Sequence, residues 1–180
     1  MKKTGNMNIA ELAAFICTHL NNSGIKCILT GGACISIYTD NKYESFDLDF
    51  IDCTYRSRKQ IAEELGKIGF IENNRYFVNN ETKYFIEFPA GPLSIGSEPV
   101  HITNELVFST GKLFLLTPTD SVKDRLAAYY FWDDKQALEQ SILLSQSQRI
   151  DLKEVERWSK AEGQINKYKQ IKKFLLNKSK

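Results

Sequence analysis

The chain is poor in several residue types that carry common chemistries. Its 180 residues include two methionines, two tryptophans, four prolines and two histidines. His19 and His101 have no partner that would complete a catalytic triad, so both are expected to be structural or surface residues. No apolar run is long enough to cross a bilayer, and we expect no membrane partnership.

The four cysteines show no pairing pattern. They form no C-x-x-C motif and have no histidine at metal-ligand spacing, so reduced thiols in a core are expected rather than a zinc site. Glu11 interrupts the apolar stretch that a signal peptide would need near the N-terminus. These features predict a cytoplasmic protein. The cysteines are Cys17, Cys27, Cys34 and Cys53.

Charge is close to balance, with 24 basic and 22 acidic side chains, so no global field favours nucleic acid or a membrane surface. The distribution is uneven. Residues 166–180 hold six lysines and no acid, and the rest of the chain carries a net charge of −4. This end could dock RNA or tRNA through salt-sensitive phosphate contacts, although a solvated terminal helix is the commoner outcome.

The composition is that of a folded protein, with 42% hydrophobic and 12% aromatic residues. A chain of this length can bury roughly 70% of its extended surface and needs no disulfide or metal to fold. We expect one domain, or one compact domain with an appendage.

Periodicity predicts alternating helices and strands over residues 1–116. Asn8 with Glu11, and Ser57 with Gln60, are capping-box signatures of two helices. A hairpin turn is indicated at Thr110, and the proline-rich stretch 89–99 is expected to be irregular. The expected strands are 25–30, 46–53, 75–78, 83–88, 105–109 and 112–116, with a short helix at 33–38.

From residue 117 the pattern is helical. Thr117 with Pro118 is a helix start, and further helices are expected to begin at Asp133 or Asp134, at Asp151 and after Gly163. Trp132 and Trp158 lie on these helices and are interpreted as packing residues rather than base-stacking platforms. The fold class is therefore α/β (α+β), with residues 1–116 as the α/β domain and 117–180 as a helical unit packed on it.

Two short motifs that could bind a ligand lie between residues 29 and 51. Gly31-Gly32 ends a strand and opens a helix, where glycine lets a backbone approach a phosphate and the free N–H groups can bind it. A plain turn is the alternative. Asp47 and Asp49 lie on one face of an apolar strand, where a hard cation such as Mg²⁺ could sit between them. A half-exposed strand with a polar face is the alternative there.

A third carboxylate, Glu87, lies on the alternating segment 83–88. If this strand neighbours the one bearing Asp47 and Asp49, three carboxylates could together bind two metal ions. A surface glutamate on an edge strand is the alternative.

The order of these motifs resembles the nucleotidyltransferase superfamily built on the DNA polymerase β-like fold. The stretch Ser45-Phe46-Asp47-Leu48-Asp49-Phe50 is most similar to AbiEii-type toxins and related small bacterial nucleotidyltransferases. The strict motif covers about 22 residues, and the topology covers most of residues 8–116. The resemblance implies a mixed sheet flanked by helices and followed by a C-terminal helical unit.

The resemblance also implies roles for individual residues. Asp47, Asp49 and Glu87 would be catalytic and would bind Mg²⁺ or Mn²⁺, with a nucleoside triphosphate (NTP) as substrate. A lysine on the first C-terminal helix would contact the nucleotide, for which Lys123 is the first candidate and Arg125 the second; a solvated helix lysine is the alternative for Lys123. The other nucleotide-binding positions would be Gly31, Gly32, Thr30, Ser36 and Ser45.

The sequence also departs from the family pattern. Ala33 stands where many members have a serine that meets a phosphate, unless Thr30 or Ser36 substitutes for it. Asn41-Lys42-Tyr43-Glu44 stands where many have an arginine, and the third acid is glutamate rather than aspartate.

Three functions remain open from the sequence. The first is Mg²⁺-dependent transfer of a nucleoside monophosphate from an NTP to a hydroxyl of RNA, protein or a small molecule, in a toxin–antitoxin or phage-defence setting. The second is a degenerate site that binds a nucleotide or a protein partner without turnover. The third is an RNA-associated toxin, or the partner of one, that docks tRNA through the lysine-rich end.

Overall fold

A computed structural model describes residues 4–176 as a mixed sheet with helices packed around it. The strand order is β3-β4-β5-β2-β1-β9-β8. The strands are β1 (Cys27–Thr30), β2 (Asp47–Asp52), β3 (Ile71–Asn73), β4 (Tyr76–Val78), β5 (Phe85–Glu87), β8 (Thr103–Phe108) and β9 (Gly111–Leu116), and β6 (Ser94–Ile95) pairs with β7 (Glu98–Pro99) apart from them. The α-helices are α1 (Ile9–Asn22), α2 (Gly31–Tyr38), α3 (Arg58–Gly66), α4 (Pro118–Trp132), α5 (Lys135–Ser147), α6 (Leu152–Ala161) and α7 (Ile165–Leu176).

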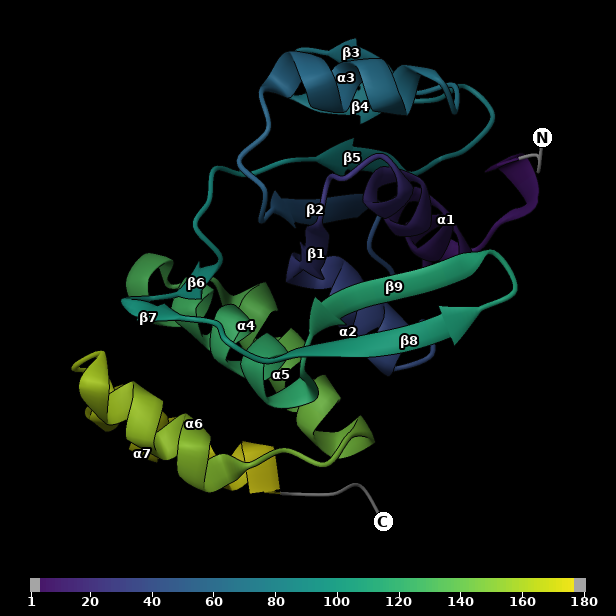
Figure 1. The fold of residues 1–180 in the computed structure, drawn as a ribbon. Coiled ribbons are helices and arrows are strands. Elements are labelled where there is room, and N and C mark those ends of the chain that lie inside the picture. Colours follow the sequence, from purple (N-terminus) through teal and green to yellow (C-terminus); the bar gives the residue numbers. More distant parts are fainter. Residues whose placement is uncertain (1–3, 177–180) are drawn as a thin grey trace.

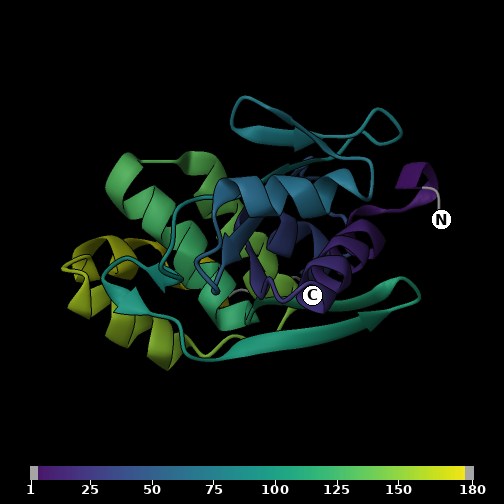
Figure 2. The same cartoon turned by 45° about the horizontal axis from the view of Figure 1, so that its top comes forward.

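Helix α1 packs on β9, β1 and β8, and it lies side by side with α3 (Figure 2). Helix α2 packs on β2 and β1 and also touches α4 and α5. Figure 1 shows α6 and α7 at the end of the molecule farthest from β3. The helices that follow β9 therefore pack mainly on α2, which begins at the paired glycines, and α4 also touches β9 itself.

Local signals set the helix starts as predicted. The Asn8 side chain accepts a hydrogen bond from the Glu11 N–H at 2.9 Å, and the Glu11 carboxylate accepts one from the Asn8 N–H. Ser57 forms the same box with Gln60. Thr117 caps α4, with Pro118 at its first position, because proline has no N–H to lose there.

Strand register brings the motif residues together. β1 is antiparallel to β2, and β2 is parallel to β5. Thr30 is paired with Asp49, and Asp49 with Glu87, so the three lie side by side across neighbouring strands. The expected hairpin also forms, because Phe108 pairs with Gly111 across a two-residue turn.

Several expectations need correction. β3 was not predicted, and all three of its side chains are exposed, so it has no apolar pattern. The stretch 89–99, expected to be irregular, contains the small β6–β7 hairpin. Cys53 is exposed because it follows β2 into a turn, whereas Cys17, Cys27 and Cys34 are buried; all four are free.

The two tryptophans behave differently. Trp158 is fully buried, as predicted, and its indole N–H donates to the Ile95 carbonyl at 3.2 Å. Trp132 was also expected to pack, but 77% of its surface is exposed. His19 is bonded to the Glu64 carbonyl and His101 is exposed, in agreement with their expected structural and surface roles. Lys178 and Lys180 of the lysine-rich end lie outside the described residues. Across residues 4–176, no helix is both long and apolar enough to cross a membrane.

Candidate active site

The junction of β1 and α2 is built around Gly31. Its φ of +71° is strained for any residue with a side chain. A Cβ at this position would also collide with the Oδ2 atom of Asp49. The Thr30 hydroxyl donates to the Asp49 backbone carbonyl at 3.2 Å and ties the two strands together. Glycine therefore lets the Asp49 carboxylate lie directly against the start of α2.

Two serines, Ser36 on α2 and Ser45 just before β2, lie next to this junction. Ser36 is fully buried, and its hydroxyl accepts the Ser45 N–H at 2.8 Å. The Ser45 hydroxyl donates a short hydrogen bond to the Asp47 carboxylate. A Cβ on Gly32 would stand 3.2 Å from the same hydroxyl. Ser36 and Ser45 thus orient Asp47, and both have internal partners already.

Asp49 lies among like charges. It shares a face of β2 with Asp47 and is in register with Glu87 on β5, while Leu48 and Phe50 point into the core. Burial, followed by the charges of Asp47 and Glu87, raises the pKa of Asp49 to about 7. Across the described residues, no ion pair is formed by Asp47 or Asp49, so the cluster has an excess of negative charge.

Two arginines approach the cluster. Arg125 on α4 is held by Asp124 at 2.6 Å and is close enough to Asp49 to oppose the rise in its pKa. Burial lowers the pKa of Arg125, but the charges of Asp124 and Asp49 outweigh that effect and raise it. Arg75 lies 3.5 Å from Glu87 on the far side, and its guanidinium stacks over the Tyr76 ring.

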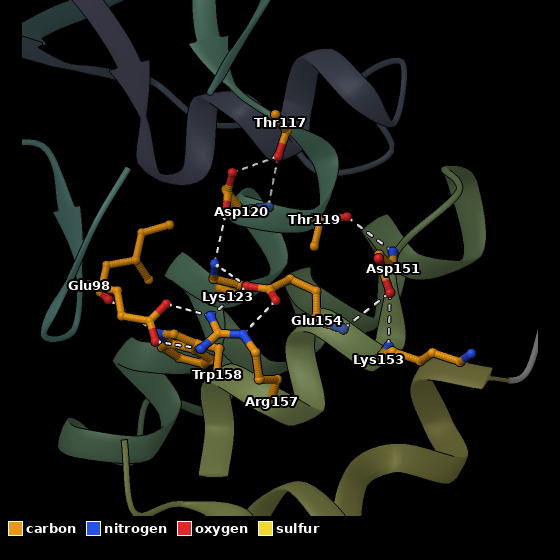
Figure 3. A network of polar contacts seen from close by, with 11 residues as sticks. Glu98, Thr117, Thr119, Asp120, Lys123, Asp151, Lys153, Glu154, Arg157 and Trp158 are labelled. Atoms are coloured by element: carbon orange, nitrogen blue, oxygen red, sulfur yellow. Dashed lines mark hydrogen bonds and ion pairs between the residues drawn. The ribbon is translucent and has the colours of Figure 1, made fainter. Parts of the chain in front are cut away.

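Lys123 is not part of this cluster. Its ammonium group lies 2.9 Å from Asp120 and 3.2 Å from Glu154, with only 8% of the side chain exposed. Figure 3 shows it inside a network in which Arg157 holds both Glu154 and Glu98. Lys123, the first candidate for the nucleotide-contacting cation, therefore lies between α4 and α6. Arg125, the second candidate, is the cation that faces Asp49.

Sequence reasoning missed Tyr43, which links the paired glycines to α5. The Tyr43 ring would stand 3.5 Å from a Cβ on Gly32, and its hydroxyl accepts the Gln136 amide at 3.3 Å. The Gln140 amide faces the same hydroxyl, while its Oε1 atom is buried with no partner in the described part of the chain. No sequence pattern marked these residues, because the contact joins positions far apart in the chain.

The carboxylates suit a hard cation only in part. Within residues 4–176, no group of three or more His, Cys, Asp and Glu side chains is arranged so that it could hold a metal ion by itself. Mg²⁺ rarely needs such a cage, since it commonly takes one or two carboxylates together with substrate phosphates and water. Asp47 and Asp49 fit that donor set, because a cation would offset both the burial of Asp49 and its repulsion by Asp47, the two largest causes of its raised pKa.

Comparison with known proteins bears on the fold. No protein-family model matches the chain, and no curated protein matches it. The solution structure of the antibiotic-resistance factor ANT(2'')-Ia, a nucleotidyltransferase, is similar with a TM-score of 0.56, over 91% of this chain and 94% of that chain.

The fold is similar to a nucleotidyltransferase fold. The two sequences are 11% identical, so the likeness concerns the fold alone. The expected mixed α/β architecture is confirmed. The suggested closeness to AbiEii-type toxins is not addressed by this match and stays a prediction.

Proposed function

We propose that the protein is a Mg²⁺-dependent nucleotidyltransferase that moves a nucleoside monophosphate from an NTP to a hydroxyl acceptor. One observation carries the proposal. The Asp49 carboxylate lies against a helix start that could bind phosphate, beside Asp47 and Glu87, and neither aspartate has an ion-pair partner among the described residues. Such excess negative charge destabilises a fold unless a cation binds the carboxylates.

Each residue then has a role. The N–H groups at Gly31 and Gly32 would bind the triphosphate, and Asp47 and Asp49 would hold Mg²⁺ (or Mn²⁺). The ion would neutralise charge on the phosphates and lower the pKa of the attacking hydroxyl. Glu87 accepts the proton of the acceptor hydroxyl. The hydroxyl oxygen bonds to the α-phosphorus, the bond to the bridging oxygen breaks, and pyrophosphate leaves.

A second candidate is a degenerate module that binds a nucleotide or a protein partner without turnover. The hydroxyl of Ser36, one of two side chains that could replace the serine missing at Ala33, already accepts the Ser45 N–H and donates to the Gly32 carbonyl at 3.5 Å. The phosphate site would then have fewer contacts than an active enzyme needs.

The acceptor class stays open within the proposal. A hydroxyl of RNA, of a protein or of a small molecule would meet the same chemistry at Glu87. A toxin–antitoxin or phage-defence role is compatible with each of them.

Calorimetric titration of each NTP, with and without Mg²⁺, tests the proposal. We expect binding that needs the metal and is lost in the Asp47→Asn/Asp49→Asn double variant. Asp52→Asn on the same strand is the control, because Asp52 holds the following turn through the Thr54 and Arg56 N–H groups. Radiolabelled NMP transfer to RNA or protein, with pyrophosphate release, would favour the enzyme. Tight binding with no transfer to any acceptor would favour the degenerate module. Binding that does not need the metal would contradict the role of Asp47 and Asp49 as metal ligands.

A further inference from the structure

One face of α4 is open, and it begins at the candidate active site. After the first turn, nearly every residue of this helix is buried as far as Tyr130. The exceptions, together with the last two residues of the helix, follow the i, i+1, i+4, i+7, i+8 spacing of residues that share one side of a helix. This open stripe consists of Asp124, Arg125 and Ala128, which are partly exposed, and of Phe131 and Trp132, which are exposed.

The two ends of the open stripe have different chemistry. Arg125 faces Asp49, and Trp132 lies seven residues further on, which is about two turns and roughly 10 Å along the axis. Ala128 lies between them; it is partly exposed, and its side chain is a single methyl group. A flat group that extends away from the carboxylates could therefore lie across Ala128 and reach the indole.

The indole is exposed and oriented. Trp132 has 77% of its surface exposed, and Phe131 has 44%. Their ring centroids are 6.0 Å apart at an interplanar angle of 73°, so the edge of one ring meets the face of the other. No hydrogen bond of the Trp132 indole is formed within the described residues. An indole that is largely exposed to water costs apolar hydration, which a stacked ligand would relieve.

The turn that follows Trp132 is fastened to the phosphate side of the site. Gln136, in the first turn of α5, donates to Tyr43, and Tyr43 lies against Gly32. Glu87 and its Arg75 lie on the far side of Asp49, where an acceptor would enter. Trp132 is thus associated with the donor nucleotide rather than with the acceptor.

We propose that Trp132, whose ring contacts that of Phe131, is the surface on which the base of the donor NTP stacks. The inference rests on the proposed function and deepens it by assigning the base end of the same site. Stacking on an indole face is tolerant of base identity, because every base has a π face. The platform therefore adds affinity for all four NTPs, and base preference has to come from other groups.

Two probes and matched variants test this assignment. The probes are the four NTPs and inorganic tripolyphosphate, each with Mg²⁺; tripolyphosphate has the phosphates but no base. The variants are Trp132→Ala, Trp132→Phe and, as the control, Phe174→Ala on α7, since Phe174 is exposed to the same 44% as Phe131. Tryptophan fluorescence gives a direct signal, because Trp158 is fully buried and only Trp132 is open to a quencher.

We expect Trp132→Ala to weaken NTP binding by roughly 5- to 100-fold and to leave tripolyphosphate binding unchanged. Trp132→Phe should retain most of the affinity, and Phe174→Ala all of it. NTPs should quench the fluorescence of the unaltered protein, and Trp132→Ala should abolish that change.

Three outcomes would overturn the assignment. NTP affinity unchanged in Trp132→Ala, with no fluorescence response in the unaltered protein, would remove the platform while the metal-dependent nucleotide site stood. An equal loss for NTP and tripolyphosphate would mean that Trp132 acts through the fold and not on the base. No NTP binding to the unaltered protein would overturn both this inference and the proposed function.

Discussion

Two clusters of charged side chains flank α4, and they differ in how their acids are balanced. In the network around Lys123, the acids Asp120, Glu154 and Glu98 each have a basic partner within 3.2 Å. Around Asp49, three carboxylates meet and neither aspartate of β2 has an ion-pair partner among the described residues. The two clusters belong to sides of the helix that are turned roughly 160° apart.

This difference in charge balance indicates that the Lys123 network has a structural role and the Asp49 cluster a functional one. A balanced network joins elements and gains nothing from a ligand, so we interpret the Lys123 network as the fastening of α6 and the β6–β7 hairpin to α4. An unbalanced cluster costs stability, which the fold recovers when a cation binds. The pKa directions express the same contrast: that of Asp49 is raised to about 7, and that of Glu154 is lowered to about 2 by Arg157 and Lys123.

The largest expected effect comes from Gly31→Ala, which would place a methyl group in the space that the Asp49 carboxylate occupies. The methyl group would collide with Asp49 and displace its carboxylate from the start of α2. We expect metal-dependent NTP binding to fall by about 100-fold or more, because both the phosphate contact and the metal ligand move. Calorimetry measures the loss.

The matched control is Gly163→Ala. Gly163 has nearly the same φ, +73°, but a Cβ there would have no neighbour within 4 Å. Both variants should lose about 1 kcal/mol of stability from backbone strain. Equal NTP binding by the two would contradict the close approach of Asp49 to Gly31.

The next effect is on stability and concerns the balanced network. Lys123→Met would leave Asp120 and Glu154 without their shared cation in a largely buried setting. We expect a loss of about 1–3 kcal/mol in the free energy of unfolding, because both acids keep some access to water. Denaturant titration measures it, with Lys160→Met, an exposed lysine on α6, as the control.

Nucleotide binding by the folded Lys123→Met variant should be unchanged. If NTP affinity fell while stability stayed the same, Lys123 would belong to the nucleotide site, as the family resemblance suggested.

A smaller effect follows from the raised pKa of Asp49. Between about pH 4, where an unfolded aspartate ionises, and pH 7, the folded protein keeps a proton that the unfolded chain has lost. Stability therefore falls as pH rises through that window. Three pKa units correspond to about 4 kcal/mol, and the partial exposure of Asp49 to water reduces this to the order of 2 kcal/mol. Thermal unfolding of metal-free protein should show this slope, and Asp49→Asn should flatten it. A slope of the same size in Asp49→Asn would assign the effect to other groups.

The smallest effect has the opposite sign and belongs to Glu154. Its lowered pKa means that the folded protein stays ionised from about pH 4 down to pH 2, where the unfolded chain takes up a proton. Stability is lost as pH falls through that window, by less than about 1 kcal/mol because a third of the side chain is exposed. Glu154→Gln should weaken this acid dependence, and Glu156→Gln, whose surface pair is with Lys172, should not.

Much of the fold was predictable because its signals are local. The caps at Asn8, Ser57 and Thr117 involve residues within one turn, and the β8–β9 hairpin follows from its turn. β3 was missed because a three-residue strand with exposed side chains has no apolar alternation to detect. Trp132 was misjudged because an aromatic at helical spacing usually packs, and the reason it does not is the open side of α4.

The site was predictable in its residue types but not in its partners. Asp47 and Asp49 share a face by strand period alone, whereas the register of Glu87 with Asp49 depends on strand order, which one sequence does not reveal. The choice between Lys123 and Arg125 depends on which side of α4 each occupies. That is decided by Glu154, thirty-one residues downstream on α6.

The connection between β9 and α4 contains a single residue. β9 ends at Leu116, and Thr117 is at once the next residue and the cap of a helix that starts at Pro118. Arg125 and Trp132 both lie on α4, so the distance from the guanidinium that faces Asp49 to the indole is set by helix geometry. The protein would then select its ligand by the distance between its phosphates and its base.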